Sequence, residues 1–183
     1  MQNLQLAVGC DCHPDLTADS YFRAPTRNLD QYRAALLEER NWLLPTGVKH
    51  FSWEALLPLH FRERLKRWKN YMRLQGIDLS NVDQPLVADI QHNPEWIGRA
   101  AKRYMPALMR QSRPWNLQRK RPMIPLEHLL VNAFPVWAPV PPVPLEYLES
   151  LPSAVVRHVA GNMMHLGALG SFISFVVLDS VEV

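Results

Sequence analysis

The chain has 183 residues, of which 48% are hydrophobic and 20% charged, and its formal net charge is +3. This composition is typical of a globular chain with a buried core and excludes an intrinsically disordered one. The positive charge is uneven. Residues 62–73 hold six Lys or Arg against one acid, and residues 99–121 hold eight Lys or Arg and no acid. A solvated helix face is the favoured interpretation of the first run, and contact with phosphate is the alternative.

The N-terminal residues carry the chain's two cysteines, Cys10 and Cys12, which lie too close together to staple a fold. Cys10-Asp-Cys-His13 resembles half of a metal clip, but a tetrahedral site needs ligands from a second element. A plain turn is therefore favoured, and no metal is predicted. No charged-then-apolar leader and no apolar run of about 18 residues is present, so an intracellular chain without a membrane partner is expected.

The elements of the first half are predicted from helix caps and apolar spacing. Residues 3–10 are a candidate strand, and residues 28–43 should form a helix that Pro45 and Gly47 stop. Residues 50–74 fit one or two amphipathic helices, offset near Pro58 and ended by Gly76 as a C-cap. Residues 86–90 are a short apolar run that suits a buried strand.

The second half alternates helix and proline-rich chain. A helix should begin near Pro125 and run to about Ala133. Six prolines between Pro135 and Pro152 predict an extended connector. Residues 162–179 should form a buried apolar helix, with a strand through 172–178 as the alternative.

Two histidines are candidate acid–base groups near neutral pH, His128 and His165. The sequence places no carboxylate or nucleophile near either of them. A role in the core or at a helix end is therefore favoured, and no catalytic residue is predicted.

Residues 121–135 resemble the ninth conserved motif of cytosine-C5 DNA methyltransferases, R-x-L-T-P-R-E-x-x-R-L-Q-G-F-P. The register has no gap. The matching positions are Arg121, Pro125, Glu127, Phe134 and Pro135. Asn132-Ala133 stands where the family has Gln-Gly, and Leu126 and Leu130 replace the two family arginines that follow the first.

Two further segments carry the same resemblance. Residues 106–112 are similar to the P-T-L-T-x-x-S segment that precedes the ninth motif, and residues 158–164 resemble the tenth motif, K-Q-x-G-N-[AS]-V. All three segments occur in the family's order. The resemblance implies an α/β fold, with part of a doubly wound, S-adenosylmethionine-dependent methyltransferase-like sheet and an irregular target-recognition region.

The resemblance also implies a division of the chain and roles for its residues. Residues 1–49 have no clear role, residues 50–120 correspond to the target-recognition region, and residues 121–183 to the C-terminal part of the methyltransferase domain. Arg121 and Glu127 would belong to the motif that braces these parts together. Gly161, Asn162 and Met163 would face S-adenosylmethionine, whose carboxylate a helix N-terminus at Asn162 would bind.

The resemblance implies DNA as a partner, and in that case the basic runs would contact it. The candidate side chains are Arg64, Arg67, Lys69, Arg110 and Arg113. If DNA is the partner, a nuclear location is expected.

The catalytic motifs of the family are missing from the sequence. Methylation at C5 needs a thiolate that follows proline, a Glu-Asn-Val and an F-x-G-x-G loop, and none of them occurs. The sequence therefore predicts a C-terminal fragment that is inactive alone and is either a piece of a longer gene product, with the other half as a partner, or a relic retained for binding. The alternatives are a non-catalytic, basic nucleic-acid-binding module and an interaction protein that docks through its Pro-rich run and C-terminal helix.

Overall fold

The computed structural model describes residues 17–39, 52–80, 86–97, 105, 108–163, 169–170, 173 and 176. The chain forms two compact units. Unit 1 comprises residues 1–16, 108–110 and 125–183, and unit 2 comprises residues 17–107 and 111–124. The predicted strand at 3–10 and the Cys10–His13 segment lie outside the described residues.

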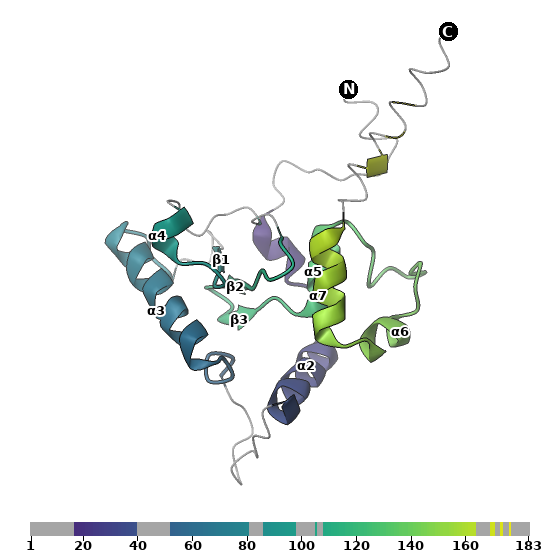
Figure 1. Ribbon diagram of the computed structural model, residues 1–183, viewed down its shortest axis with the longest axis horizontal. Helices are drawn as coiled ribbons and strands as arrows, with labels where there is room; N and C mark the ends of the chain where they lie inside the picture. The colour runs from purple at the N-terminus through teal and green to yellow at the C-terminus, as the bar shows by residue number, and fades with distance from the viewer. Residues whose placement is uncertain are drawn as a thin grey trace. The chain divides into compact units, whose positions relative to one another are not determined.

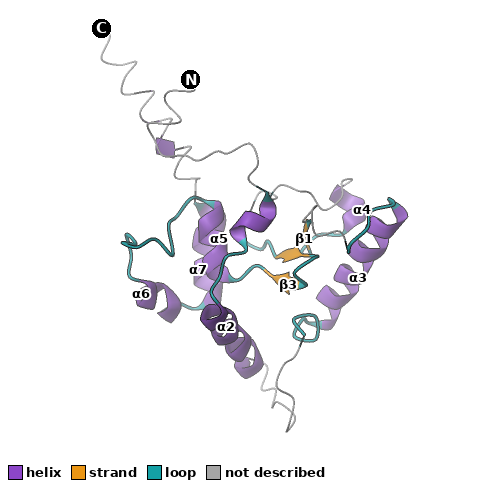
Figure 2. Ribbon diagram, turned by 180° about the vertical axis from the view of Figure 1, so that it is seen from behind, coloured by secondary structure: helices purple, strands orange, loops and turns teal. Residues whose placement is uncertain are grey.

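Unit 2 contains most of the helical residues and the sheet (Figures 1 and 2). Its elements are the 3-10 helix η1 (Ala18–Tyr21), the helices α2 (Thr26–Glu39), α3 (Leu59–Leu74) and α4 (Pro94–Ile97), and the strands β1 (Val87–Asp89), β2 (Pro114–Asn116) and β3 (Arg121–Pro122). The predicted strand at 86–90 is confirmed as β1. The predicted helix at 28–43 begins two residues earlier, and the structure describes it to Glu39.

Helix α3 is amphipathic because its apolar residues recur at helical spacing. Phe61, Leu65, Trp68 and Met72 are all buried and form one stripe. They pack with residues of α2, β1 and β2 and with Trp53 in one hydrophobic core. Of the one or two helices predicted for residues 50–74, the structure describes one, α3. Its N-cap is Pro58, and residues 53–57 before it form turns.

Gly76 ends α3 as predicted. Its φ of +71° is left-handed, which suits glycine. The Gly76 N–H donates to the Arg73 carbonyl at 3.0 Å, and the Ile77 N–H donates to the Met72 carbonyl at 3.0 Å. These two bonds define a Schellman motif, which satisfies carbonyls that the helix itself cannot.

The three strands form one antiparallel sheet in the order β1-β2-β3. Ala88 pairs with Trp115, and Trp115 pairs with Pro122. Strands β2 and β3 form a hairpin in which Lys120 has a φ of +51°. The prediction of a mixed helix-and-strand fold is therefore confirmed. The sheet in the described part of the chain is antiparallel, however, whereas a doubly wound sheet is mostly parallel.

Unit 1 is built around the helices α5 (Pro125–Val131) and α7 (Ser153–Asn162), which pack side by side (Figures 1 and 2). Helix α5 begins at the predicted proline. A further helix, α6 (Leu145–Ser150), lies between them. The prediction that residues 135–152 are wholly extended is thus wrong, because residues 145–151 contain no proline and leave room for a short helix between Pro144 and Pro152.

The prediction that a helix begins at Asn162 is also wrong. Asn162 is the last residue of α7, and Met163 after it is extended, with φ −74° and ψ 141°. Helix α7 begins at Ser153, directly after Pro152. Pro152 is the N-cap residue, and its fixed φ and extended ψ suit the start of a helix. Most of the predicted 162–179 helix lies outside the described residues.

None of the helices in the described ranges is both long and apolar enough to cross a membrane.

Candidate functional site

Helix α5 lies in the segment that resembles the ninth motif, and the end of α7 lies in the segment that resembles the tenth. The buried side chain of Asn132 makes a hydrogen bond between them. The Asn132 Nδ2 donates a hydrogen bond of 2.8 Å to the carbonyl oxygen of Ala160. Ala160 lies in the last turn of α7, where carbonyls lack the usual partner four residues on, and its carbonyl accepts a longer bond of 3.4 Å from the Met163 N–H as well. Asn132 is 9% exposed, so water cannot easily replace its amide. The side chain therefore caps α7 from the end of α5.

The end of α5 repeats the geometry of the end of α3, but with alanine in the place of glycine. The Ala133 N–H donates to the Leu130 carbonyl at 2.9 Å, and the Phe134 N–H donates to the Leu129 carbonyl at 3.1 Å. Ala133 has a φ of +60°, a left-handed conformation that costs an L-residue about 1–2 kcal/mol. This is the position at which the ninth-motif pattern has glycine.

Gly161 lies against another part of the chain. A Cβ built on Gly161 would stand 2.5 Å from the backbone nitrogen of Arg110, 2.6 Å from its Cα and 2.8 Å from the carbonyl carbon of Met109. Such distances cannot be accommodated without a backbone shift. The small residue therefore makes room for the chain at 109–110, which belongs to the segment that resembles P-T-L-T-x-x-S.

The predicted cofactor positions do not form the expected anion site. Asn162 is exposed and Met163 half-buried, at the C-terminal end of α7. A helix C-terminus presents carbonyl oxygens and the negative end of the macrodipole, which disfavour a carboxylate. The Asn162 Nδ2 lies 2.9 Å from the His158 Nε2, and the space at Gly161 is filled by backbone. These residues therefore do not fit the predicted binding of the S-adenosylmethionine carboxylate.

The two predicted bracing residues are both buried. Arg121 is 5% exposed, with its guanidinium carbon 4.9 Å from the centroid of the Phe22 ring and its Nη1 donating to the Pro122 carbonyl at 3.1 Å. Glu127 is 0% exposed in α5. Arg121 belongs to unit 2 and Glu127 to unit 1. Burial of both is what a structural role requires.

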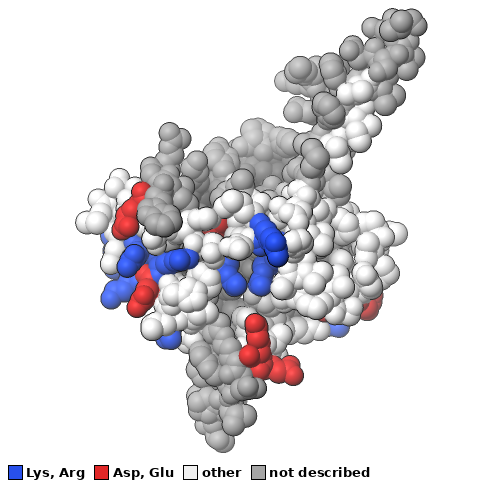
Figure 3. Space-filling model, in the orientation of Figure 1, with Lys and Arg blue, Asp and Glu red and all other residues white. Residues whose placement is uncertain are grey.

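Two of the predicted DNA-contacting cations on α3 are engaged within the protein. The Arg64 Nη1 donates to the Gln91 carbonyl, and Lys69 pairs with Glu54. Arg67, by contrast, is exposed. Three further exposed cations of this helix are Arg62, Lys66 and Arg73. Figure 3 shows one group of basic side chains over α3, with acidic side chains between them, and a second basic group nearer the middle of this face.

The remaining predicted cations lie in different units. Arg110 is exposed in unit 1. Arg113 is half-buried in unit 2, where its guanidinium carbon lies 4.7 Å from the centroid of the Phe61 ring. Its N–H donates to the Asp89 Oδ1 at 2.8 Å. Arg113 therefore has a clear packing role, and of the five predicted cations Arg67 and Arg110 are the exposed ones.

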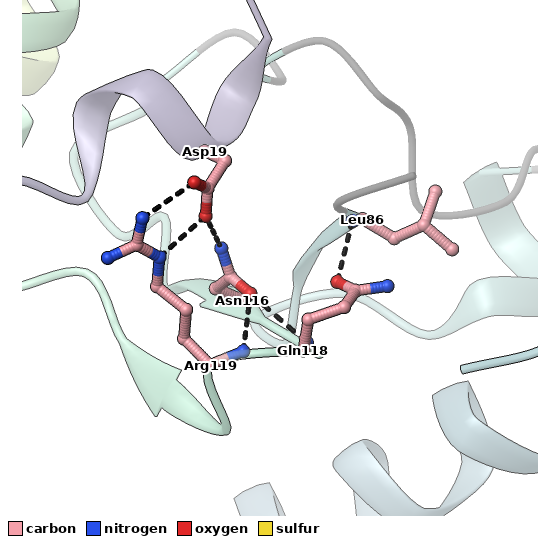
Figure 4. A network of polar contacts seen from close by, with 5 residues as sticks. All are labelled: Asp19, Leu86, Asn116, Gln118 and Arg119. Atoms are coloured by element: carbon pink, nitrogen blue, oxygen red, sulfur yellow. Dashed lines mark hydrogen bonds and ion pairs between the residues drawn. The ribbon is translucent and has the colours of Figure 1, made fainter. Parts of the chain in front are cut away.

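A polar network that the sequence analysis did not identify ties η1 to the β2–β3 hairpin (Figure 4). The Asp19 carboxylate accepts bonds of 2.6 Å from both the Nε and the Nη2 of Arg119, and one of 2.8 Å from the Asn116 Nδ2. The hydrogen bond from Arg119 holds the pKa of Asp19 below its usual range, against a smaller opposing effect of burial.

The network continues into the hairpin and the neighbouring strand. The Asn116 Oδ1 accepts from the N–H groups of Gln118 and Arg119, and the Gln118 Oε1 accepts from the Leu86 N–H at 2.7 Å. Asn116 is fully buried. Asp19 and Arg119 are 100 residues apart, so no local sequence signal joins them. The described residues hold no group of three or more His, Cys, Asp or Glu that would bind a metal.

No protein-family model, no curated protein and no solved structure matches the chain.

Proposed function

We propose that this chain corresponds to the C-terminal part of a cytosine-C5 DNA methyltransferase and contributes DNA contact and a structural brace, without the groups that perform methyl transfer. One observation carries the proposal. Parts of the three segments that resemble the family, residues 108–110, 125–135 and 158–163, lie together in unit 1, although the first and the last are far apart in the sequence.

The departures from the family pattern have a physical account that supports this proposal. Asn132 replaces a glutamine, and its amide makes a bond to the helix of the tenth-motif-like segment. Ala133 replaces a glycine and has the left-handed conformation that glycine favours. The left-handed backbone at the motif's glycine position is compatible with the resemblance, although helices commonly end in this way.

DNA contact is assigned in this proposal to the exposed cations of α3. Arg62, Lys66 and Arg73 are spaced by four and seven residues, which places them on one stripe beside the buried stripe. Arg67 lies on the adjoining exposed stripe. Side chains of this kind neutralise phosphates and release condensed counterions, which gives affinity without base specificity.

The chemistry of methyl transfer lies outside the proposed role of this chain. The sequence has no Pro-Cys and no Glu-Asn-Val, and the residues at the end of α7 do not fit the cofactor carboxylate. The doubly wound sheet would then belong to the catalytic half, against which α5 and α7 would pack. The short antiparallel sheet of unit 2 would belong to the recognition region.

Binding to a short duplex DNA, followed by fluorescence anisotropy over a range of salt concentrations, tests the DNA contact. The Lys66→Ala/Arg67→Ala variant should weaken binding and reduce the slope of log K against log salt by about 2, since two phosphate contacts are lost. The Arg23→Ala/Arg27→Ala variant, which removes the same charge from exposed residues elsewhere in unit 2, is the matched control. Equal losses in both variants would overturn the assignment to α3.

Transfer of labelled methyl groups from S-adenosylmethionine to DNA tests the catalytic part of the proposal. The purified chain should give no incorporation above background, because it has no cysteine positioned behind proline. Incorporation that survives replacement of both Cys10 and Cys12 by Ser would show a different chemistry and overturn the family assignment.

A further inference from the structure

Residues 138–144, here called the proline run, have the sequence Ala-Pro-Val-Pro-Pro-Val-Pro. Every residue in the run either is proline or directly precedes one. Proline fixes its own φ near −65°, and the residue before it is pushed to extended conformations. The sequence of the run therefore favours extended backbone, and Pro144 at its end is extended, with φ −54° and ψ 135°.

The proline run is accessible. It forms the loop between α5 and α6 (Figures 1 and 2). Val140 is 87% exposed, Pro139, Pro142 and Pro144 are exposed as well, and Pro141 and Val143 are half-buried. Within the described part of the chain, the backbone of residues 139–143 makes no hydrogen bond. The Val140 side chain and the exposed prolines beside it are therefore open to a partner.

The chemistry of the run excludes two of the common modes of peptide recognition. Addition to a sheet edge needs regularly spaced N–H donors, and residues 139–143 have only those of Val140 and Val143. Docking as an amphipathic helix is excluded by the four prolines. Recognition as a polyproline II helix by an aromatic-lined groove remains.

We propose that the proline run is a ligand for an SH3-like domain, with Val140-Pro141 and Val143-Pro144 filling two neighbouring aromatic slots. A polyproline II helix has three residues per turn, so these two Val-Pro pairs lie on the same side and Pro142 between them points away. The run bends at residues 138–140 and 142–143 in this structure, so binding straightens it. Its four fixed φ angles keep the entropy lost in that step small.

The charges near the proline run indicate which charge the partner's groove should carry. No Lys or Arg occurs from residue 122 to residue 156, and Glu146 and Glu149 follow the run in α6. Glu146 is exposed. The rim of the groove that meets this flank must therefore be neutral or basic, since an acidic rim would be repelled. This inference is independent of the proposed contact with DNA.

The test uses the full chain on a biosensor surface and a panel of purified SH3 domains with acidic, neutral and basic groove rims. A domain with a neutral or basic rim should bind, and Pro141→Ala/Pro144→Ala should weaken that binding by at least about tenfold, equivalent to about 1.4 kcal/mol. Pro142→Ala is the matched control and should change affinity by less than about twofold.

Pro144 is the N-cap residue of α6, so the Pro141→Ala/Pro144→Ala variant could also change this helix. A second variant leaves α6 unchanged. Val140→Asp changes a side chain that the fold does not bury, and it should abolish binding while the circular dichroism spectrum stays unchanged. Absence of binding to every domain of the panel at millimolar concentration would overturn the proposal. An effect of Pro142→Ala as large as that of the double variant would overturn the assignment of the two Val-Pro pairs.

Discussion

The Asn132 side chain, at the end of α5, donates its amide hydrogen to the carbonyl of Ala160 in the last turn of α7, across 28 residues of sequence. Asn132→Ala would leave that carbonyl without this donor in a site that is nearly closed to water. The expected loss in free energy of unfolding is about 0.5–1.5 kcal/mol, the usual net contribution of one hydrogen bond, because the Ala160 carbonyl keeps a longer bond of 3.4 Å from the Met163 N–H. Urea unfolding followed by circular dichroism measures it.

Asn162→Ala is the matched control for that substitution. Asn162 ends the same helix, but its side chain is exposed and contacts only His158 in the described part of unit 1. Its replacement should change the free energy of unfolding by less than about 0.5 kcal/mol, as is usual for surface positions. A loss at Asn162 equal to that at Asn132 would mean that the bond to Ala160 does not hold the helix pair together.

The Gly161→Ala variant tests whether Gly161 is needed for packing against residues 109–110. In an ordinary helix, this exchange stabilises by up to about 1 kcal/mol, because alanine is the better helix former. Here the new Cβ would meet the backbone of Met109 and Arg110, so we expect a loss of about 1–3 kcal/mol instead. The sign of the change in urea unfolding decides the question. A stabilised variant would show that segment 109–110 does not limit the space at Gly161.

Ala133→Gly and Gly76→Ala are opposite exchanges at equivalent positions of two Schellman motifs. Both positions are left-handed, with φ of +60° at Ala133 and +71° at Gly76. The first exchange should stabilise and the second destabilise, each by about 1 kcal/mol, because only glycine avoids the Cβ penalty. Thermal unfolding of the two variants measures both. A Cβ added at Gly76 would have no heavy atom within 4 Å, so the Gly76→Ala variant reports the backbone conformation alone.

The parts of the fold that local sequence governs could be predicted. The stripe of Phe61, Leu65, Trp68 and Met72 predicts α3, the apolar run at 86–90 predicts β1, and Gly76 predicts the end of α3. Each of these features depends on residues within a few positions of one another. The start of α5 at Pro125 is of the same kind.

The interactions between distant residues could not be predicted. Arg64 and Arg67 are alike in the sequence, but in the structure Arg64 is half-buried and donates to the Gln91 carbonyl, whereas Arg67 is exposed. The sequence predicts the start of a helix at Asn162, because the apolar residues after it recur at helical spacing. In the structure Asn162 is the last residue of α7. Asp19 and Arg119 pair across 100 residues.

Asp19→Asn should destabilise unit 2 in a pH-dependent way. The pKa of Asp19 is held below its ordinary value of 3.8, chiefly by the hydrogen bond from Arg119. The contribution of this carboxylate is therefore fully present above pH of about 4–5 and is lost as the pH falls through the lowered pKa. The stability difference between the parent chain and the variant should shrink over that acid range.

The size of the effect at neutral pH is about 1 kcal/mol, because the Asp19 and Arg119 side chains are 29% and 47% exposed and solvent screens the pair. Arg119→Ala and the double variant complete a double-mutant cycle in urea unfolding at pH 7 and in acid. A coupling energy that is the same at both pH values would show that ionised Asp19 does not stabilise the hairpin.

Arg64→Ala and Arg67→Ala should separate stability from DNA binding on one helix. The guanidinium of Arg64 donates to the Gln91 carbonyl, next to the bond of 3.0 Å from the Trp68 Nε1 to the His92 carbonyl, so α3 holds the loop after β1 at two points. Loss of the first should cost about 1–3 kcal/mol in urea unfolding. Arg67 is exposed, and its loss should change stability by less than about 0.5 kcal/mol.

Duplex DNA binding should show the reverse order. Under conditions in which both variants are fully folded, Arg67→Ala should lower affinity and reduce the salt slope by about 1, whereas Arg64→Ala should leave the slope unchanged. Arg64→Lys tests geometry, because a lysine keeps the charge but presents a single ammonium in place of the planar guanidinium. If Arg64→Ala keeps full stability and loses as much DNA affinity as Arg67→Ala, then Arg64 is a phosphate ligand, and the contact with Gln91 is incidental.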